Sequence, residues 1–265
     1  MSKIKFEPTN NKVGCFIYTD LKVVKQDQID EIKNLLNKYG VLFFKNQNLG
    51  PREYINFSSN FGTPAEYPML KPHKDFKDIY VIERKKTDTG KSFGEGPHTD
   101  SSYLESPPRF TFLQAIEVPE EGKGNTLFYN QFLAYEALPK AMKDKIENLK
   151  GIFSSQGKIA QTRELRMADH GTSGKKEIKS QHKLVQSIDG RKTIYCSPGH
   201  VVGINNLHSE QEELINFLSS HQIKKDFSFS FGWNKGDIAL WSNRSMLHAA
   251  TSFNGDRKMF RITIK

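Results

Sequence analysis

The chain has 265 residues, 36% of them hydrophobic, which is enough length and apolar content to bury a substantial core. Its two cysteines, Cys15 and Cys196, are too few and too far apart for a disulfide framework or a structural zinc site, so we expect a reducing, cytoplasmic compartment. There is no run of roughly 18 apolar residues and no apolar signal core near residue 1, so we expect neither secretion nor a membrane span.

The net charge of +9 raises the question of an anionic partner, because clustered Lys and Arg bind phosphate with release of counterions. The densest basic stretches, 83–91 and 170–183, are polar and interleaved with acids, a pattern typical of solvated loops. We therefore expect a small-molecule substrate and no nucleic acid or membrane partner, and a homo-oligomer stays open. The positive field favours small anionic substrates.

The first part of the chain has a helix, strand and helix pattern. Residues 27–40 place apolar side chains on one helical face and end at Gly40, and residues 41–47 are as apolar as a buried strand. A second helix is predicted at 51–62, because Pro51 has the favoured position in the first turn. The apolar face of the first helix consists of Ile29, Ile32, Leu35 and Leu36.

Most of the remaining chain consists of short segments that are rich in aromatic or β-branched residues and separated by turn residues, which predicts a sandwich or jelly roll. Two helical insertions interrupt these segments, at 131–150 and 209–222, and the second has Ser209 and Glu212 at the spacing of a capping box. Eight strands are expected, at 78–84, 109–118, 125–130, 183–189, 192–197, 227–233, 237–243 and 259–265.

Residues 154–182 differ from the strands on both sides, because they are polar, contain glycine and have no periodicity. A loop of this length inside a compact domain is usually functional or disordered. We therefore predict a lid over the functional site in this segment.

The local pattern with the most chemical content is GPHTDSSY, in which His98 and Asp100 are two residues apart. In extended backbone this spacing places both side chains on the same face. Two histidines with one carboxylate are the ligand set that leaves three open positions on non-haem Fe(II), so a second histidine is required. Without it, the alternative is a surface turn in which His98 and Asp100 make local hydrogen bonds.

His248 is the best candidate for the third ligand. It follows the apolar strand 237–243 and a polar turn, and it begins a second short strand that can return its side chain to the same cleft. The other histidines lie mostly in polar loops or at helix edges, where we expect solvated side chains: His73, His170, His182, His200, His208 and His221.

Two arginines near the end of the chain, Arg257 and Arg261, are four residues apart in the segment RKMFRITIK, which runs into the predicted strand 259–265. An even separation places both guanidinium groups on one face, so both can point into the barrel. Buried arginines need anionic partners, and a bidentate bond to a carboxylate meets that need. The alternative is that both lie at an exposed strand end.

At this point the sequence resembles a known family, the TauD/TfdA group of 2-oxoglutarate-dependent dioxygenases. The resemblance covers most of the chain and is carried by GVLFFKNQ and the residues after it (40–62), HTDSSYLESPPRF and the residues after it (98–139), HKLVQSIDG to VVGI (182–204), and GDIALWSNRSMLHAATSF to MFR (236–261). It implies a mainly β fold with helical insertions, a double-stranded β-helix (jelly roll, cupin-like), as a single domain over residues 1–265.

The resemblance also implies roles for individual residues. Iron would be bound by His98, Asp100 and His248, with no catalytic residue beyond these metal ligands. Arg257 and the Thr126 hydroxyl would bind the distal carboxylate of 2-oxoglutarate, with Arg261 beside the cosubstrate and substrate anions. Trp241 would line the pocket, although strand packing is the alternative for Thr126 and Trp241. Substrate contacts would come from Tyr67, Gly94, Ser101 and Arg261.

The implied reaction is oxidative decarboxylation of 2-oxoglutarate with O2 to succinate and CO2, coupled to hydroxylation of a C–H bond, an EC 1.14.11 type activity. The substrate part of the sequence departs from the taurine-oxidising members, which have a His where this chain has Tyr67 and an Asn where it has Gly94. Pro97 also replaces the Trp that is frequent before the first iron ligand. Two alternatives stay open: an oxygenase that acts on a macromolecule, and a catalytically silent metal-binding β-barrel.

Overall fold

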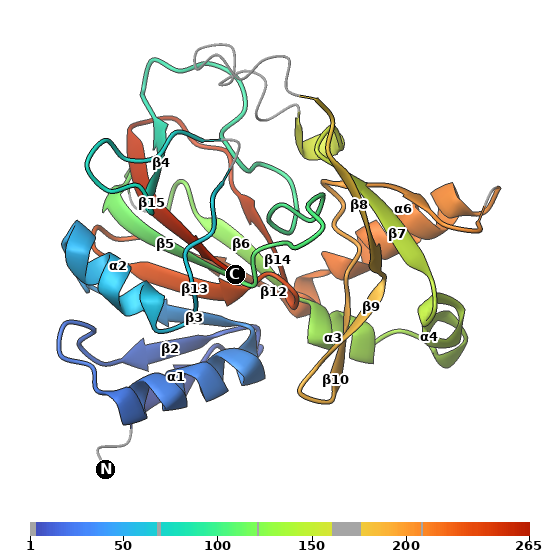
Figure 1. The fold of residues 1–265 in the computed structure, drawn as a ribbon, viewed down its shortest axis with the longest axis horizontal. Coiled ribbons are helices and arrows are strands. Elements are labelled where there is room, and N and C mark those ends of the chain that lie inside the picture. Colours follow the sequence, from blue (N-terminus) through green and yellow to red (C-terminus); the bar gives the residue numbers. More distant parts are fainter. Residues whose placement is uncertain (1–3, 68–69, 121, 161–175, 208) are drawn as a thin grey trace.

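A seven-stranded sheet contains strands from both ends of the chain (Figure 1). The computed structural model describes residues 4–67, 70–120, 122–160, 176–207 and 209–265. Because the first and last strands of the chain share this sheet, we keep the whole chain as one proposed domain. In spatial order the strands are β1 (Lys5–Pro8), β2 (Cys15–Tyr18), β3 (Val41–Phe44), β13 (Ile238–Ser242), β5 (Phe110–Glu117), β15 (Arg257–Ile264) and β4 (Tyr80–Arg84).

A three-stranded sheet supplies the second layer of the sandwich and consists of β12 (Ser228–Phe231), β6 (Thr126–Asn130) and β14 (Met246–Ala250). Aromatic side chains fill the space between the two sheets. The Phe43 ring stacks on Phe231 with centroids 4.3 Å apart and meets the edge of Phe128 at 5.5 Å. Two facing sheets with helical insertions confirm the predicted mainly β architecture.

The opposite face of the large sheet is covered by α1 (Gln26–Tyr39) and α2 (Pro51–Ser59), which lie on the same side of it in Figure 1. Side chains of β3 alternate, so that Phe43 packs between the sheets and Leu42 and Phe44 pack towards the helices. Both faces of this strand are therefore buried, which explains its continuous apolar run. Both helices were predicted, and α2 begins at Pro51.

A smaller layer on the other side of the molecule has its own apolar core (Figure 1). The two-residue turn between β9 (Val185–Ile188) and β10 (Arg191–Ile194), Asp189 and Gly190, has φ values of 48° and 80°, which suits a tight hairpin. The elements of this layer are α3 (Gln131–Glu136), α4 (Lys140–Ile146), β7 (Lys150–Ser154), η1 (Lys158–Ala160), β8 (Lys179–Lys183), β9 (Val185–Ile188), β10 (Arg191–Ile194), β11 (Val201–Ile204), α6 (Gln211–Gln222) and η3 (Lys225–Phe227).

The single helix predicted at 131–150 is wrong, because the structure has two short helices and the start of β7 there. Pro139 stands between α3 and α4 and has no N–H to continue the first helix. Asn130 caps α3, since its side chain accepts hydrogen bonds from the backbone N–H groups of Phe132 and Leu133.

The predicted capping box at Ser209 is also wrong. Helix α6 begins at Gln211, and its N-cap residue Glu210 makes no side-chain capping bond. The Gln211 side chain instead accepts a hydrogen bond from the backbone N–H of Ile204, which ties the helix to β11.

The predicted lid segment is only partly described. Its start contains η1, and residues 179–182 belong to β8, which pairs with β7, so the irregular stretch is shorter than predicted. Residues 161–175 lie outside the described residues, and the lid role stays a prediction. In the part of the chain that the structure describes, no helix is long and apolar enough to cross a membrane.

Candidate metal centre

Backbone pairing brings the first and last predicted metal ligands together. His98 lies outside the named strands but forms an isolated antiparallel bridge with His248 in β14. The His98 N–H donates to the His248 carbonyl at 3.0 Å, and the His248 N–H donates to the His98 carbonyl at 2.9 Å. The sequence had suggested that His248 begins a strand, but His248 is the third residue of β14. The pairing fixes two side chains that are 150 positions apart in the sequence.

The Asp100 carboxylate completes the cluster. Its Oδ1 lies 3.7 Å from His98 Nε2 and 3.4 Å from His248 Nε2. One ligand atom from each of the three residues lies within 4.8 Å of the others, and all three residues are buried. The three residues that the sequence predicted as ligands therefore lie in one place.

The donor atoms of this cluster fit a metal ion. His98 Nδ1 lies 2.9 Å from the Gly96 carbonyl oxygen, which can only accept, so Nδ1 carries the proton and Nε2 offers a lone pair. That lone pair points to the same region as Asp100 Oδ1, a buried oxygen without a hydrogen bond of good geometry. Two imidazole nitrogens and one carboxylate oxygen are the ligand set of non-haem Fe(II) sites.

Electrostatics keep His98 and Asp100 in the forms that a metal ion requires. Burial and the nearby His248 ring lower the pKa of His98 well below its ordinary value. Burial alone would raise the pKa of Asp100, but the Arg261 guanidinium and the two imidazole rings hold it well below its usual range. At neutral pH His98 is therefore neutral and Asp100 is an anion.

A cavity adjoins the cluster and contains the predicted arginine pair. Arg257 and Arg261 are both buried in β15, and Arg261 Nη2 lies 2.8 Å from Asp100 Oδ1. Thr126 Oγ1 accepts a hydrogen bond from the indole N–H of Trp233 at 3.0 Å, so its own proton remains available for a carboxylate. The lining residues are Ile82, Phe93, Gly94, His98, Leu113, Thr126, Trp241, His248, Ala250, Arg257 and Arg261.

The residues predicted around the substrate have different positions. Gly94 lines the cavity, and a Cβ placed on it would lie 3.5 Å from the His98 ring. The Tyr67 ring faces the Arg261 guanidinium, with 4.3 Å between Cζ and the ring centroid. Ser101 has a φ of 47° and its hydroxyl donates to the Tyr103 oxygen at 3.4 Å. Ser101 is not one of the described residues that line the cavity.

Several residues at the centre could not be recognised from the sequence. Thr111 donates a hydrogen bond to Asp100, and Asn243 donates one to Thr111. Two histidines that we expected to be solvated are also buried: His200, whose ring centroid lies 6.2 Å from that of His98, is 3% exposed, and His221, in α6 away from this cluster, is 4% exposed. The one sequence signal for these residues is a polar residue inside an apolar strand, as Thr111 is. Such residues are too common in strands to identify a functional position.

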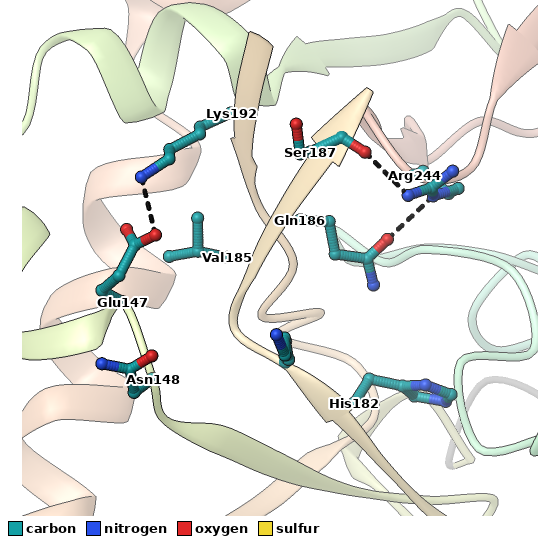
Figure 2. A pocket seen from close by; sticks show the side chains of 9 residues that line it. Glu147, Asn148, His182, Val185, Gln186, Ser187, Lys192 and Arg244 are labelled. Atoms are coloured by element: carbon teal, nitrogen blue, oxygen red, sulfur yellow. Dashed lines mark hydrogen bonds and ion pairs between the residues drawn. The ribbon is translucent and has the colours of Figure 1, made fainter. Parts of the chain in front are cut away.

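A second, larger pocket of about 390 Å³ lies among β8, β9, β10 and the end of α4 (Figure 2). Three of its charged groups have protein partners: Lys192 pairs with Glu147 at 2.6 Å, and Arg244 donates to Gln186 and to the Ser187 carbonyl. This pocket contains none of the residues predicted for the metal centre.

Comparisons with known proteins agree with the geometry. A family model described as "Taurine catabolism dioxygenase TauD, TfdA family" matches residues 6–263. An alkylsulfatase of Acinetobacter baylyi is 30% identical over 88% of this chain and 75% of its own length. The alpha-ketoglutarate-dependent 2,4-dichlorophenoxyacetate dioxygenase of Cupriavidus pinatubonensis is 25% identical over 86% of this chain and 84% of its own length.

A solved structure shows the same fold. The crystal structure of a taurine dioxygenase from Burkholderia xenovorans superposes with a TM-score of 0.82 at 24% identity. The similarity covers 99% of this chain and 91% of that one. Together with the family match, it confirms the jelly-roll prediction.

Proposed function

The chain belongs to the taurine catabolism dioxygenase TauD, TfdA family. We propose that its buried centre holds Fe(II), 2-oxoglutarate and a small anionic substrate. As a member of this family it is a dioxygenase that uses Fe(II), 2-oxoglutarate and O2. The observation that carries the proposal is the buried cluster of His98, Asp100 and His248 beside a pair of buried arginines.

Three residues would hold the metal: His98 and His248 through Nε2, and Asp100 through Oδ1. Bound Fe(II) supplies the redox chemistry that couples decarboxylation of 2-oxoglutarate to hydroxylation of a C–H bond. The protein contributes position and exclusion of water. All three side chains are buried, and His98 is held in the required tautomer by the Gly96 carbonyl.

Arg257 and Thr126 would bind the distal carboxylate of 2-oxoglutarate. Both line the cavity that contains the two histidines, so a molecule in this cavity can contact the metal and the guanidinium together. A guanidinium offers a carboxylate two parallel donors, and the Thr126 hydroxyl adds a third. Arg261 lines the same cavity, and it also contacts Asp100 at 2.8 Å.

The proposed substrate is a small anion that undergoes C–H hydroxylation. Relatives named for sulfonates, alkyl sulfates and 2,4-dichlorophenoxyacetate support an anionic class. The net charge of +9 and the guanidinium of Arg261 in the cavity wall support it as well. Taurine is not the preferred substrate in this proposal, because Tyr67 and Gly94 replace the polar side chains of the taurine-oxidising members.

A substrate panel tests this proposal. Under saturating 2-oxoglutarate, we expect an alkyl sulfate, a sulfonate, a phosphonate or an aryloxy acid to give more substrate-dependent succinate than taurine or neutral amides. Efficient sulfite release from taurine would contradict the taurine part. A neutral amide as the best substrate would contradict the anionic part.

Arg261→Lys separates the two roles that Arg261 can have. The lysine keeps a positive charge beside Asp100 but loses the planar fork that binds an oxyanion with two bonds. If Arg261 binds the substrate, the KM for the best anion should rise while the KM for 2-oxoglutarate stays constant. A rise in the 2-oxoglutarate KM alone would assign Arg261 to the cosubstrate.

We also propose that the protein acts in the cytoplasm. Cys15 and Cys196 are both buried free thiols. Unpaired cysteines of this kind are typical of a reducing compartment.

A further inference from the structure

A chain of buried hydrogen bonds leads to the oxygen of Asp100 that does not face the histidines. Asp100 Oδ2 accepts a hydrogen bond from the Thr111 hydroxyl at 2.7 Å. Thr111 Oγ1 in turn accepts one from Asn243 Nδ2 at 2.8 Å. Asn243 Oδ1 accepts one from the Trp241 indole N–H at 3.1 Å. We name these four residues the Asp100 chain, and each of them is at most 1% exposed.

The chemistry of the donors gives the Asp100 chain one direction. The Trp241 indole nitrogen can only donate, so the Asn243 oxygen must face it and the Asn243 amide nitrogen must face Thr111. The Thr111 hydroxyl has a single proton, and because its oxygen already accepts from Asn243, that proton is donated to Asp100. The backbone keeps Asn243 in place, since its N–H donates to the Arg109 carbonyl at 2.9 Å.

We propose that Thr111, oriented by Asn243 and Trp241, is a positioning residue that holds Asp100 Oδ2 so that Oδ1 is the oxygen offered to the metal. This inference rests on the proposed function, because it assigns a role to residues behind a proposed metal ligand. Oδ1 is the oxygen that lies 3.4 Å and 3.7 Å from the two imidazole nitrogens, and Oδ2 is the oxygen bound by Thr111. Oδ1 therefore faces the two imidazole rings and also Arg261 Nη2 at 2.8 Å, whereas Oδ2 is held by the Thr111 hydroxyl.

The physical reason is the rotational freedom of a carboxylate. Without the Thr111 hydroxyl, Asp100 Oδ2 would lose a charge-assisted hydrogen bond in a buried site, and the side chain could rotate to find another donor. Rotation moves Oδ1 out of the position that it shares with the two imidazole nitrogens. Loss of a group that orients a metal ligand typically lowers metal affinity by about 10- to 100-fold.

The experiment measures the affinity of the metal-free protein for Co(II) alone, followed by the visible absorption of the bound ion, so that the readout does not depend on turnover. Thr111→Val removes the hydroxyl and keeps the size of the side chain, and it should weaken Co(II) binding by about 10- to 100-fold. Thr111→Ser keeps the hydroxyl and should bind Co(II) with nearly wild-type affinity.

Thr263→Val is the matched control. Thr263 lies directly opposite Thr111 on the neighbouring strand and is 1% exposed where Thr111 is 0% exposed. Thr263→Val loses one buried hydrogen bond, to the Ala65 carbonyl, whereas Thr111→Val loses the bonds to Asp100 and Asn243. It donates to that carbonyl and not to Asp100. We therefore expect Thr263→Val to lower the stability of the protein while its Co(II) affinity stays unchanged.

Equal Co(II) affinities for Thr111→Val and Thr263→Val would overturn the proposal. If Thr111→Val does not fold, Trp241→Phe gives a second test, because loss of the indole N–H lets the Asn243 amide rotate and draw the Thr111 proton away from Asp100. That variant should bind Co(II) about twofold to tenfold more weakly, and wild-type affinity would overturn the proposal equally. If the wild-type protein binds no Co(II), or if His98→Ala binds it as well as wild type, the proposed metal centre fails.

Discussion

Replacement of His98, Asp100 or His248 by alanine is expected to abolish Fe(II)-dependent turnover of 2-oxoglutarate and to weaken Fe(II) binding strongly. Each residue supplies one of three proposed ligand atoms in a buried cluster, and a three-ligand site cannot keep its geometry with two. The measurement is anaerobic Fe(II) binding to each variant, together with succinate formation in air.

His221→Ala is the control for removal of a buried histidine. His221 is 4% exposed in α6, and its Nε2 lies 2.7 Å from the Ala134 carbonyl, away from the proposed ligands. We expect this variant to bind Fe(II) normally when it is folded. Full activity of any of the three ligand variants would remove that residue from the site.

Arg257→Ala should raise the apparent KM for 2-oxoglutarate by about tenfold or more. A hydrogen bond between charged groups contributes about 1.5 to 3 kcal/mol, and about 1.4 kcal/mol corresponds to a factor of ten. Arg257 is buried in the wall of the same cavity as the two histidines, so its guanidinium would meet the carboxylate at the end of 2-oxoglutarate distal to the metal. Steady-state kinetics at saturating substrate give the KM.

Arg84→Ala is the matched control for this variant. Arg84 lies directly opposite Arg257 on β4, is equally buried at 6% exposure, and packs on the same Phe253 ring. Its guanidinium donates to the carbonyls of Asp88 and Gly90, and it is not among the cavity residues. The KM for 2-oxoglutarate should stay at the wild-type value in this variant. An unchanged KM in Arg257→Ala would move the anchor to Arg261.

The strands that position the site could be predicted because their signals are local. Alternation and β-branched residues identify β5, β6, β13 and β15, and these four strands carry Thr111, Thr126, Trp241 and the two arginines. Pairing is not local, so nothing in the sequence indicates that His98 and His248 exchange backbone hydrogen bonds. His248 was selected from the other histidines by its position after an apolar strand and a polar turn, and the resemblance to a known family implied the same residue.

The elements that sequence reasoning missed have weak intrinsic signals. β1 and β2 lie at one edge of the large sheet, and β8 has the polar sequence KSQHK, in which β propensity is low. The structure gives β8 a partner in β7, and this pairing decides its conformation. Tertiary contacts also reversed the expectation for His200, whose Nδ1 lies 2.9 Å from the Ser102 hydroxyl in the interior.

The Asp100 chain could not be predicted for the same reason. Thr111 and Asn243 are 132 positions apart, and they meet only because β5 pairs with β13. A threonine in a strand is ordinary in any sheet, so its hydroxyl acquires a role only when the position of Asp100 is known.

Succinate formation by metal-stripped protein is the most direct test of the central claim. The protein is supplied with 2-oxoglutarate, air and the anionic substrate panel, with and without added Fe(II). We predict succinate only when Fe(II) is present, an increase in its rate with at least one anion of the panel, and none from His98→Ala. Folded wild-type protein that gives no succinate above the iron-free control with any panel member, or His98→Ala that gives as much as wild type, would contradict the account.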